Sequence, residues 1–164
     1  SYRGYFGPAP QHGSTAVLAD TGGPPDHWLL SATSSDLLEW SIEPGVRIGP
    51  GSTVLTASAR EVYPLLRDDG CVTLFYQLNK PQDAGISNYD GVAVVGYSTS
   101  SDGLTFTKQF PLITTRDPAG PDVFTMPDGS RLLYHDSTDR DGYGHGIRVG
   151  RLDKVAVAGH NTLN

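Results

Sequence analysis

The sequence predicts an all-β fold made of antiparallel, four-stranded sheets of the β-propeller type. The first observation is composition: 20 glycines and 12 prolines make up about a fifth of the 164 residues, and both residue types destabilise helix interiors. The second is spacing, because only residues 26–43 run beyond twelve positions without a glycine or proline. An all-α or doubly wound chain would need several such stretches. The third observation is an internal repeat.

Two segments of the sequence recur in the same order. The pattern Thr-Ser-Ser-Asp-x-Leu-x-aromatic occupies residues 33–40 and again residues 99–106. An Asp-Gly turn followed by an apolar segment that contains an aromatic residue occupies residues 69–76 and again residues 128–135. Asp-Gly between apolar runs is a strong signal for a β-hairpin. The repeat therefore predicts a hairpin-rich module that the chain uses more than once.

The clearest module predicts four antiparallel strands, at residues 62–67, 72–77, 92–98 and, as a short edge strand, 104–108. The Asp-Gly turn, a polar loop over residues 79–90 and the Thr-Ser-Ser-Asp turn connect them. A third module supplies strands at 123–126, 131–135 and 147–152. We therefore divide the single domain, residues 1–164, into units 12–58, 59–118 and 119–164. Four-stranded sheets that recur in units of this length are typical of propeller blades. A β-sandwich with similar turns is the alternative.

Three units are fewer than a closed propeller needs, because closed rings typically contain at least four blades. We therefore expect an incomplete ring, a part of a larger propeller, or an assembly. Uncovered sheet faces and edges favour association, so self-association is the expected behaviour of the isolated chain. The residues expected in the core between blades are Leu74, Tyr76, Val94, Phe106, Val123, Leu132 and Leu133.

Composition and charge exclude several classes of function. The net charge is −6 and basic residues form no cluster, so nucleic acid is not an expected partner. No stretch approaches the roughly 18 apolar residues of a membrane span, which predicts a soluble chain, secreted or cytoplasmic. No cofactor is expected. His145 and His160 lack a third ligand at close spacing, which predicts no metal site. Cys71 lies in an apolar run and is expected to be a buried structural thiol.

Two motifs resemble those of the five-bladed propeller glycoside hydrolases, family 43 and its family 32 invertase-like relatives. Residues 31–40 are similar to the S-x-DL-x-x-W pattern that ends a blade there. Gly120-Pro121-Asp122-Val123-Phe124, followed by an Asp-Gly pair at residues 128–129, is similar to the DP-x-V-F…D-G blade opening. The resemblance covers roughly residues 12–153 and implies a propeller that acts on carbohydrate. The Asp-box of sialidases is only approximated, at residues 100–106.

Polar residues just before the innermost strand of each blade are the ones that reach the central funnel of such a propeller. Aligning the three units places His12, Glu61 and Asp122 at this opening position. Glycoside hydrolysis uses two carboxyl groups, which makes Glu61 and Asp122 a candidate pair. The resemblance implies that Asp122 holds the sugar and adjusts the pKa of the catalytic acid. His12 stands where the family has its Asp base, and the family's acid would lie beyond residue 164.

Four further residues are candidates for substrate binding. Arg116 and Asp117 echo the RDP motif of the family 32 enzymes, in which the Asp stabilises the transition state, and they compete with Asp122 for the same place. His135 ends a predicted strand and Tyr63 offers an aromatic platform for a sugar. Both also fit purely structural roles, because strand aromatics are most often core residues.

The same ambiguity applies to the two carboxylates, because Glu61 could instead pair with its neighbour Arg60 and Asp122 could be a turn residue. The preferred function is a glycoside hydrolase-like propeller that acts on or binds a carbohydrate or another hydroxyl-rich small molecule. One alternative is a repurposed propeller that catalyses dehydration or cyclisation of a metabolite, with His12 as the base. The other is a non-catalytic carbohydrate-binding module.

Overall fold

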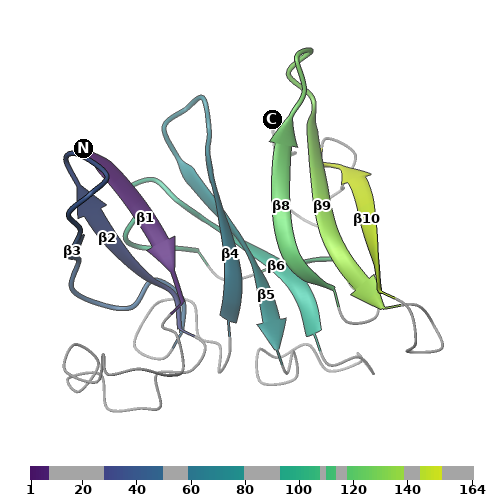
Figure 1. Ribbon diagram of the computed structural model, residues 1–164, viewed down its shortest axis with the longest axis horizontal. Coiled ribbons are helices and arrows are strands. Elements are labelled where there is room, and N and C mark those ends of the chain that lie inside the picture. Colours follow the sequence, from purple (N-terminus) through teal and green to yellow (C-terminus); the bar gives the residue numbers. More distant parts are fainter. Residues whose placement is uncertain are drawn as a thin grey trace.

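The fold consists of three antiparallel sheets that follow one another in chain order (Figure 1). The structure is a computed structural model, and it describes residues 1–7, 28–49, 59–79, 93–107, 110–113, 118–138 and 145–152. Every regular element within these ranges is a β-strand. The all-β, antiparallel prediction is therefore confirmed for the described part of the chain.

The second sheet contains the four strands that the clearest repeat unit predicts. It runs in the order β4 (Ala59–Leu66), β5 (Val72–Asn79), β6 (Ala93–Ser100) and β7 (Phe110–Ile113). The expected edge strand at residues 104–108 is wrong, because residues 101–105 form a bend and the fourth strand begins only at Phe110. The predicted Thr-Ser-Ser-Asp turn is present, but its hydrogen bonds to Asp102 reach the backbone N–H groups of residues 104 and 105, so these residues belong to the turn and not to the strand.

The first sheet contains β1 (Tyr2–Phe6), β2 (Leu30–Ser34) and β3 (Ser41–Ile42). It thus includes a strand that lies before residue 12, where we had placed the start of the first unit. Arg3 pairs with Thr33 just as Thr73 pairs with Thr99. Because Thr33 and Thr99 are equivalent in the repeat, β1 corresponds to β5. No described strand of the first sheet corresponds to β4.

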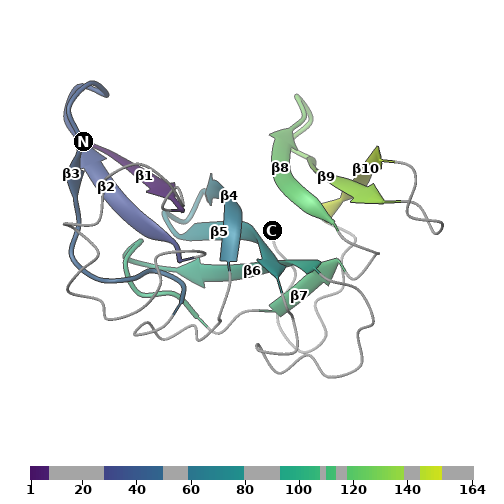
Figure 2. The ribbon, with the colours of Figure 1, turned by 60° about the horizontal axis from the view of Figure 1, so that its bottom comes forward.

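The third sheet contains β8 (Ala119–Thr125), β9 (Arg131–Thr138) and β10 (His145–Arg151), in that order. The Asp-Gly turn between β8 and β9 corresponds to the turn between β4 and β5, so β8 is the equivalent of β4. Figure 2 shows β4 and β8 as the strands of their sheets that lie toward the middle of the molecule.

Apolar side chains fill the spaces between the sheets. One cluster joins the first and second sheets, and another joins the second and third. Six of the seven expected core residues are buried, whereas Leu132 is only half-buried because it lies on the outer face of the third sheet. Cys71 is also half-buried rather than buried, since it directly follows an exposed turn. The second cluster consists of Phe75, Tyr97, Val123, Leu133 and Leu152.

The repeated Thr-Ser-Ser-Asp segment is a turn that one carboxylate holds together. The carboxylate of Asp102 accepts hydrogen bonds from the Ser100 hydroxyl and from the backbone N–H groups of residues 104 and 105, each at 2.7 Å. Asp36 accepts the equivalent three bonds at 2.9–3.0 Å. The backbone N–H bonds, and then the serine bond, hold the pKa of both carboxyl groups below the usual range.

These two turns predict a loss of stability in acid. A carboxyl group whose pKa is depressed by folding stabilises the folded state above its unfolded pKa, about 3.9. That stabilisation disappears as the pH falls through the folded pKa. We expect the melting temperature to fall below about pH 4, and to fall less steeply in Asp102→Asn, which has no carboxyl group to protonate at this turn. Thermal melts across the acid range measure both slopes, and equal slopes would contradict the assignment.

Candidate functional site

The structure describes four of the seven residues that the sequence singles out. Glu61 and Tyr63 lie on β4, while Asp122 lies on β8 and His135 on β9. The strands β4 and β8 are in contact, so the first three residues lie at one junction between the second and third sheets. The remaining three, His12, Arg116 and Asp117, lie outside the described residues.

Both strands at this junction contain a β-bulge. The pairing of β4 with β5 shifts between Arg60 and Tyr63, and the pairing of β8 with β9 shifts between Ala119 and Asp122. Within each bulge one residue has a left-handed backbone, Glu61 in β4 and Gly120 in β8, both with φ of 52°. Glu61 is therefore equivalent to Gly120, and Tyr63 to Asp122. The unit alignment, which placed Glu61 opposite Asp122, is offset by two residues.

Glu61 links the two strands directly. Its Oε2 atom accepts a hydrogen bond of 2.6 Å from the backbone N–H of Gly120. The side chain is exposed, and a left-handed backbone costs an ordinary L-residue roughly 1–2 kcal/mol. Strained residues of this kind concentrate at functional sites. The strained backbone and the hydrogen bond that links the two strands together make Glu61 a candidate functional residue.

Asp122 and Tyr63 lie close together beside this link. Partial burial raises the pKa of the Tyr63 phenol, and the negative charge of Asp122 raises it further. The side chain of Asp122 is exposed, and that of Tyr63 is half-buried. A Cβ atom added to Gly120 would meet no atom of the described residues within 4 Å beyond its two chain neighbours. The junction therefore combines two carboxylates and a phenol with open space, an arrangement that accepts hydrogen bonds from a hydroxyl-rich ligand.

His135 does not belong to this group. Successive residues of a strand point to opposite faces of the sheet, and the neighbouring residue Tyr134 pairs with Asp122. His135 is only 5% exposed, and its Nδ1 lies 2.8 Å from the carbonyl oxygen of Asp136. Its face carries Val123 and Leu133 of the second core cluster. The structure thus separates His135 from the exposed carboxylates.

The sequence analysis missed Gly120 as a site residue. Its left-handed backbone leaves open space at the opening of β8, next to both carboxylates. The available signal was a glycine directly before a proline at the start of a strand, which is a common mark of an irregular backbone.

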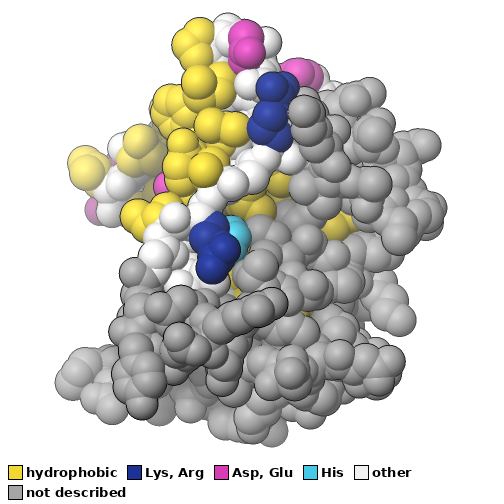
Figure 3. Space-filling view, turned by 90° about the vertical axis from the view of Figure 1, so that its right-hand side faces the viewer, with side chains coloured by type: hydrophobic (Ala, Val, Ile, Leu, Met, Phe, Trp, Pro, Cys, Tyr) yellow, Lys and Arg dark blue, Asp and Glu magenta, His cyan; other side chains and the backbone are white. Residues whose placement is uncertain are grey.

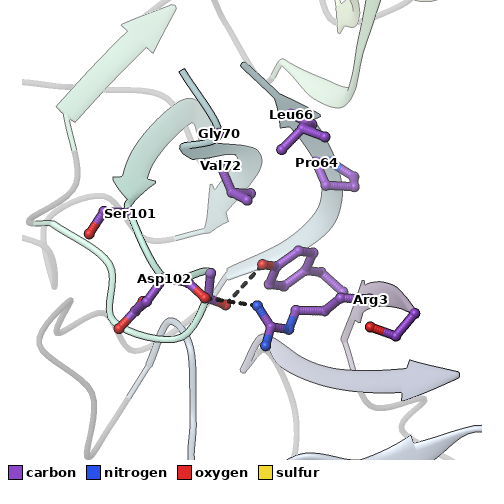
Figure 4. Close-up of a pocket in the computed structure, with 10 residues that line it drawn as sticks. Arg3, Pro64, Leu66, Gly70, Val72, Ser101 and Asp102 are labelled. Carbon is purple, nitrogen blue, oxygen red and sulfur yellow. Dashed lines mark hydrogen bonds between the residues drawn. The ribbon is translucent and has the colours of Figure 1, made fainter. Parts of the chain in front are cut away.

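A separate cavity of about 410 Å³ lies between the first and second sheets. Figure 4 shows Arg3 directed toward the turn at Asp102. Arg3 Nη1 donates to the carbonyl oxygen of Asp102 at 2.8 Å, and the Tyr5 hydroxyl donates to that of Gly103 at 2.9 Å. Among the described residues, its lining includes neither Glu61, Tyr63, Asp122 nor His135. The side chains of Arg3 and Tyr5 in this cavity therefore join the first sheet to the second.

Comparison with known proteins identifies the fold. No family model and no curated protein sequence matches the chain. A thermostable family-43 glycoside hydrolase matches in structure over 76% of this chain and 44% of its own, with a TM-score of 0.56 and 17% identity. A putative exo-β-1,3-galactanase from Bifidobacterium bifidum s17 matches over 80% and 41%, with a TM-score of 0.53 and 17% identity.

A protein of unknown function from Dyadobacter fermentans DSM 18053 matches over 79% of this chain and 42% of its own, with a TM-score of 0.54 and 18% identity. The chain therefore has the β-propeller fold of the family-43 glycoside hydrolases, as its two motifs predict. It spans less than half the length of each of these three structures. Within the described ranges, no helix has the length and apolar character to cross a membrane.

Proposed function

We propose that the chain is part of a glycoside hydrolase-like propeller and binds a carbohydrate at the junction of β4 and β8. The observation that carries this proposal is the exposed carboxylate of Asp122 beside the Tyr63 phenol, next to the open space at Gly120. Sugar hydroxyls donate hydrogen bonds to a carboxylate, and such charge-assisted bonds are about twice as strong as neutral ones. The likeness to a family-43 glycoside hydrolase supports the same class of ligand.

The two carboxylates have different roles in this proposal. Asp122 accepts hydrogen bonds from the ligand, because nothing in its surroundings buries it. Glu61 fixes the spacing of β4 and β8 through its bond to Gly120 and presents a second carboxyl group at the same opening. Hydrolysis of a glycosidic bond requires one carboxyl group as acid and another as base or nucleophile. Glu61 and Asp122 are the pair we propose for that chemistry.

The residues outside the described ranges complete the proposal. His12 is proposed as a further acid–base group, and Arg116 with Asp117 as further ligands for the sugar. His135 was expected to bind substrate as well, but its buried position on the opposite face makes it the weakest of the proposed site residues.

Replacing Asp122 tests the proposed site. Asp122→Asn keeps the size of the side chain but removes its charge, and a hydrogen bond to a charged group contributes about 1.5–3 kcal/mol. We expect at least roughly tenfold weaker carbohydrate binding with an unchanged melting temperature. Calorimetric titration with a panel of pentose and hexose oligosaccharides measures the affinity, and release of phenol from aryl glycosides measures hydrolysis.

The matched control is Asp68→Asn, which neutralises a fully exposed carboxylate in the turn after β4. It is expected to bind like the wild type. Glu61→Gln separates the two activities, because loss of hydrolysis with retained binding would assign Glu61 to the chemical step. If Asp122→Asn binds and reacts like the wild type, the junction is not the site and the likeness extends to the fold alone.

A further inference from the structure

Three buried polar side-chain atoms in the described part of the chain have no hydrogen-bond partner. They are Nε of Arg67, Oγ1 of Thr73 and Nε of Arg131. Thr73 as a whole is fully buried. A buried polar group without a partner is costly, and in native structures such a group commonly marks a bound water or ion. The three atoms therefore raise the question of what binds them.

Two of these residues lie on the face of the second sheet that contacts the third sheet. Thr73 pairs with Leu65, and paired residues point to the same face of a sheet. Leu65 packs against the second core cluster, which joins these two sheets. Arg67 lies two positions after Leu65 and therefore on the same face. Its backbone N–H continues the pairing of the hairpin, because it donates to the carbonyl oxygen of Cys71 at 2.9 Å.

Arg131 reaches the same space from the third sheet. It lies two positions before Leu133, which belongs to the second core cluster, so both side chains point toward the second sheet. Leu132 lies between them and points to the outer face, where hydrophobic side chains gather (Figure 3). Arg131 Nη2 lies 3.9 Å from Oδ1 of Asp68, the residue directly after Arg67. The two arginines therefore lie at the same end of the two sheets, beside their Asp-Gly turns.

The arginine of the third sheet is particular to this contact between sheets. Thr125 pairs with Arg131 just as Leu66 pairs with Val72, so Arg131 is the equivalent of Val72 in the repeat. Val72 packs against the apolar cluster between the first and second sheets. A charged side chain thus stands between the second and third sheets where the preceding contact has an apolar one.

The three groups together offer hydrogen-bond donors and positive charge. A guanidinium group can only donate, and a hydroxyl group can donate as well as accept. Arg67 Nη2 pairs with Oδ2 of Asp69 at 2.9 Å. Within the described ranges, the only salt bridge of Arg131 is the long one to Asp68, whose carboxylate is fully exposed, and such pairs are weak in water. The side chains of Arg67 and Arg131 are 24% and 17% exposed, so a solute can approach them from the turns.

We propose that a tetrahedral oxyanion of the phosphate class binds between the second and third sheets, held by Arg67, Thr73 and Arg131. Its oxygen atoms accept hydrogen bonds from the Nε–H groups of both arginines and from the Thr73 hydroxyl, and planar guanidinium groups suit an oxyanion. Glu61 lies near the start of β4, whereas Arg67 directly follows the end of this strand. The oxyanion site is therefore separate from the proposed carbohydrate site and joins the two sheets that form it.

The dependence of thermal stability on phosphate tests the proposal. We expect the melting temperature of the wild type to rise saturably, by roughly 5–10 °C at a hundredfold excess of phosphate over its dissociation constant. Sulfate is expected to act like phosphate, and sodium chloride of equal ionic strength is not. Arg67→Gln and Arg131→Gln are each expected to abolish the saturable rise. Arg148→Gln is the matched control, because it removes the same charge from an exposed residue on β10, and it is expected to respond like the wild type.

Thr73→Val gives the sharper result, because the substitution removes the hydroxyl and nearly keeps the side-chain volume. Removing a hydroxyl that binds nothing leaves phosphate binding unchanged, whereas removing one that donates to a charged ligand weakens it. Calorimetric titration is expected to show at least roughly tenfold weaker phosphate binding, and far-ultraviolet circular dichroism verifies that each variant stays folded. A wild type without a saturable response overturns the proposal. So does an Arg131→Gln or Thr73→Val variant that binds phosphate like the wild type.

Discussion

Gly103→Ala is expected to destabilise the protein by about 3 kcal/mol, because it adds a steric conflict to a backbone penalty. Gly103 is buried and has φ of +71°, a conformation that costs an L-residue roughly 1–2 kcal/mol. A Cβ atom there would overlap the Arg3 guanidinium and lie 2.7 Å from the Tyr5 hydroxyl. Both side chains would have to leave the turn carbonyls that they bind. The melting temperature should fall by roughly 6–12 °C.

Gly70→Ala is the matched control for this prediction. Gly70 has φ of +82°, but a Cβ atom added there would meet nothing within 4 Å in the described part of the chain beyond its two neighbours. The Gly70→Ala variant is therefore destabilised by the backbone penalty alone, about 1–2 kcal/mol. Chemical denaturation of both variants separates the two contributions. An equal loss of stability in the two would mean that the contact between the first and second sheets tolerates displacement of Arg3 and Tyr5.

Glu43→Gln is expected to lower the free energy of unfolding by about 2–3 kcal/mol, because the carboxylate stands between two arginines. Arg3 Nε and Nη2 donate to the two Glu43 oxygens at 2.8 and 2.9 Å, and the Ser31 hydroxyl donates to Oε2 at 2.7 Å. Ser31 in turn accepts a bond of 2.7 Å from the buried Arg47. The amide would remove the carboxylate that binds Arg3 and acts on Arg47, and would leave Arg47 only the more weakly acting charge of Asp102.

The directions in which the pKa values of Glu43 and Arg47 shift support this expectation. Burial opposes ionisation of Glu43, but the hydrogen bonds from Arg3 and Ser31 prevail and lower its pKa. Burial lowers the pKa of the Arg47 guanidinium, while Glu43 acts against that change. Arg3→Gln in the Glu43→Gln background should cost less than Arg3→Gln alone. Additive losses measured in the full double-mutant cycle would show that the two side chains do not interact energetically.

Much of the architecture could be predicted from the sequence, because the repeated turns carry a local physical signal. Asp36 and Asp102 each accept hydrogen bonds from the backbone N–H groups two and three residues further on, so the motif specifies its conformation without distant partners. The Asp-Gly pairs likewise supply a glycine with positive φ at Gly70 and Gly129. Strand order in the second sheet follows from these turns.

The site was harder to predict because it depends on two bulges. A bulge adds one residue to a strand and so changes which side chains face the same way. Nothing in the local sequence signals that Glu61 adopts a left-handed backbone, since the residue is neither glycine nor asparagine. Because β4 and β8 carry the same bulge, Tyr63 and not Glu61 is the equivalent of Asp122 in the repeat. The burial of His135 depends on alternation along β9, whose register is set by its partners.

The bonds between the first sheet and the Asp102 turn bear on how this fold persists while its sequence changes. Arg3 and Tyr5 bind carbonyl oxygens of the main chain, and every residue type supplies that oxygen. Substitutions in the accepting turn therefore leave the acceptors in place as long as Asp102 and Gly103 keep the backbone shape. The side chains of the first and second sheets can therefore change in sequence independently of each other without loss of this contact.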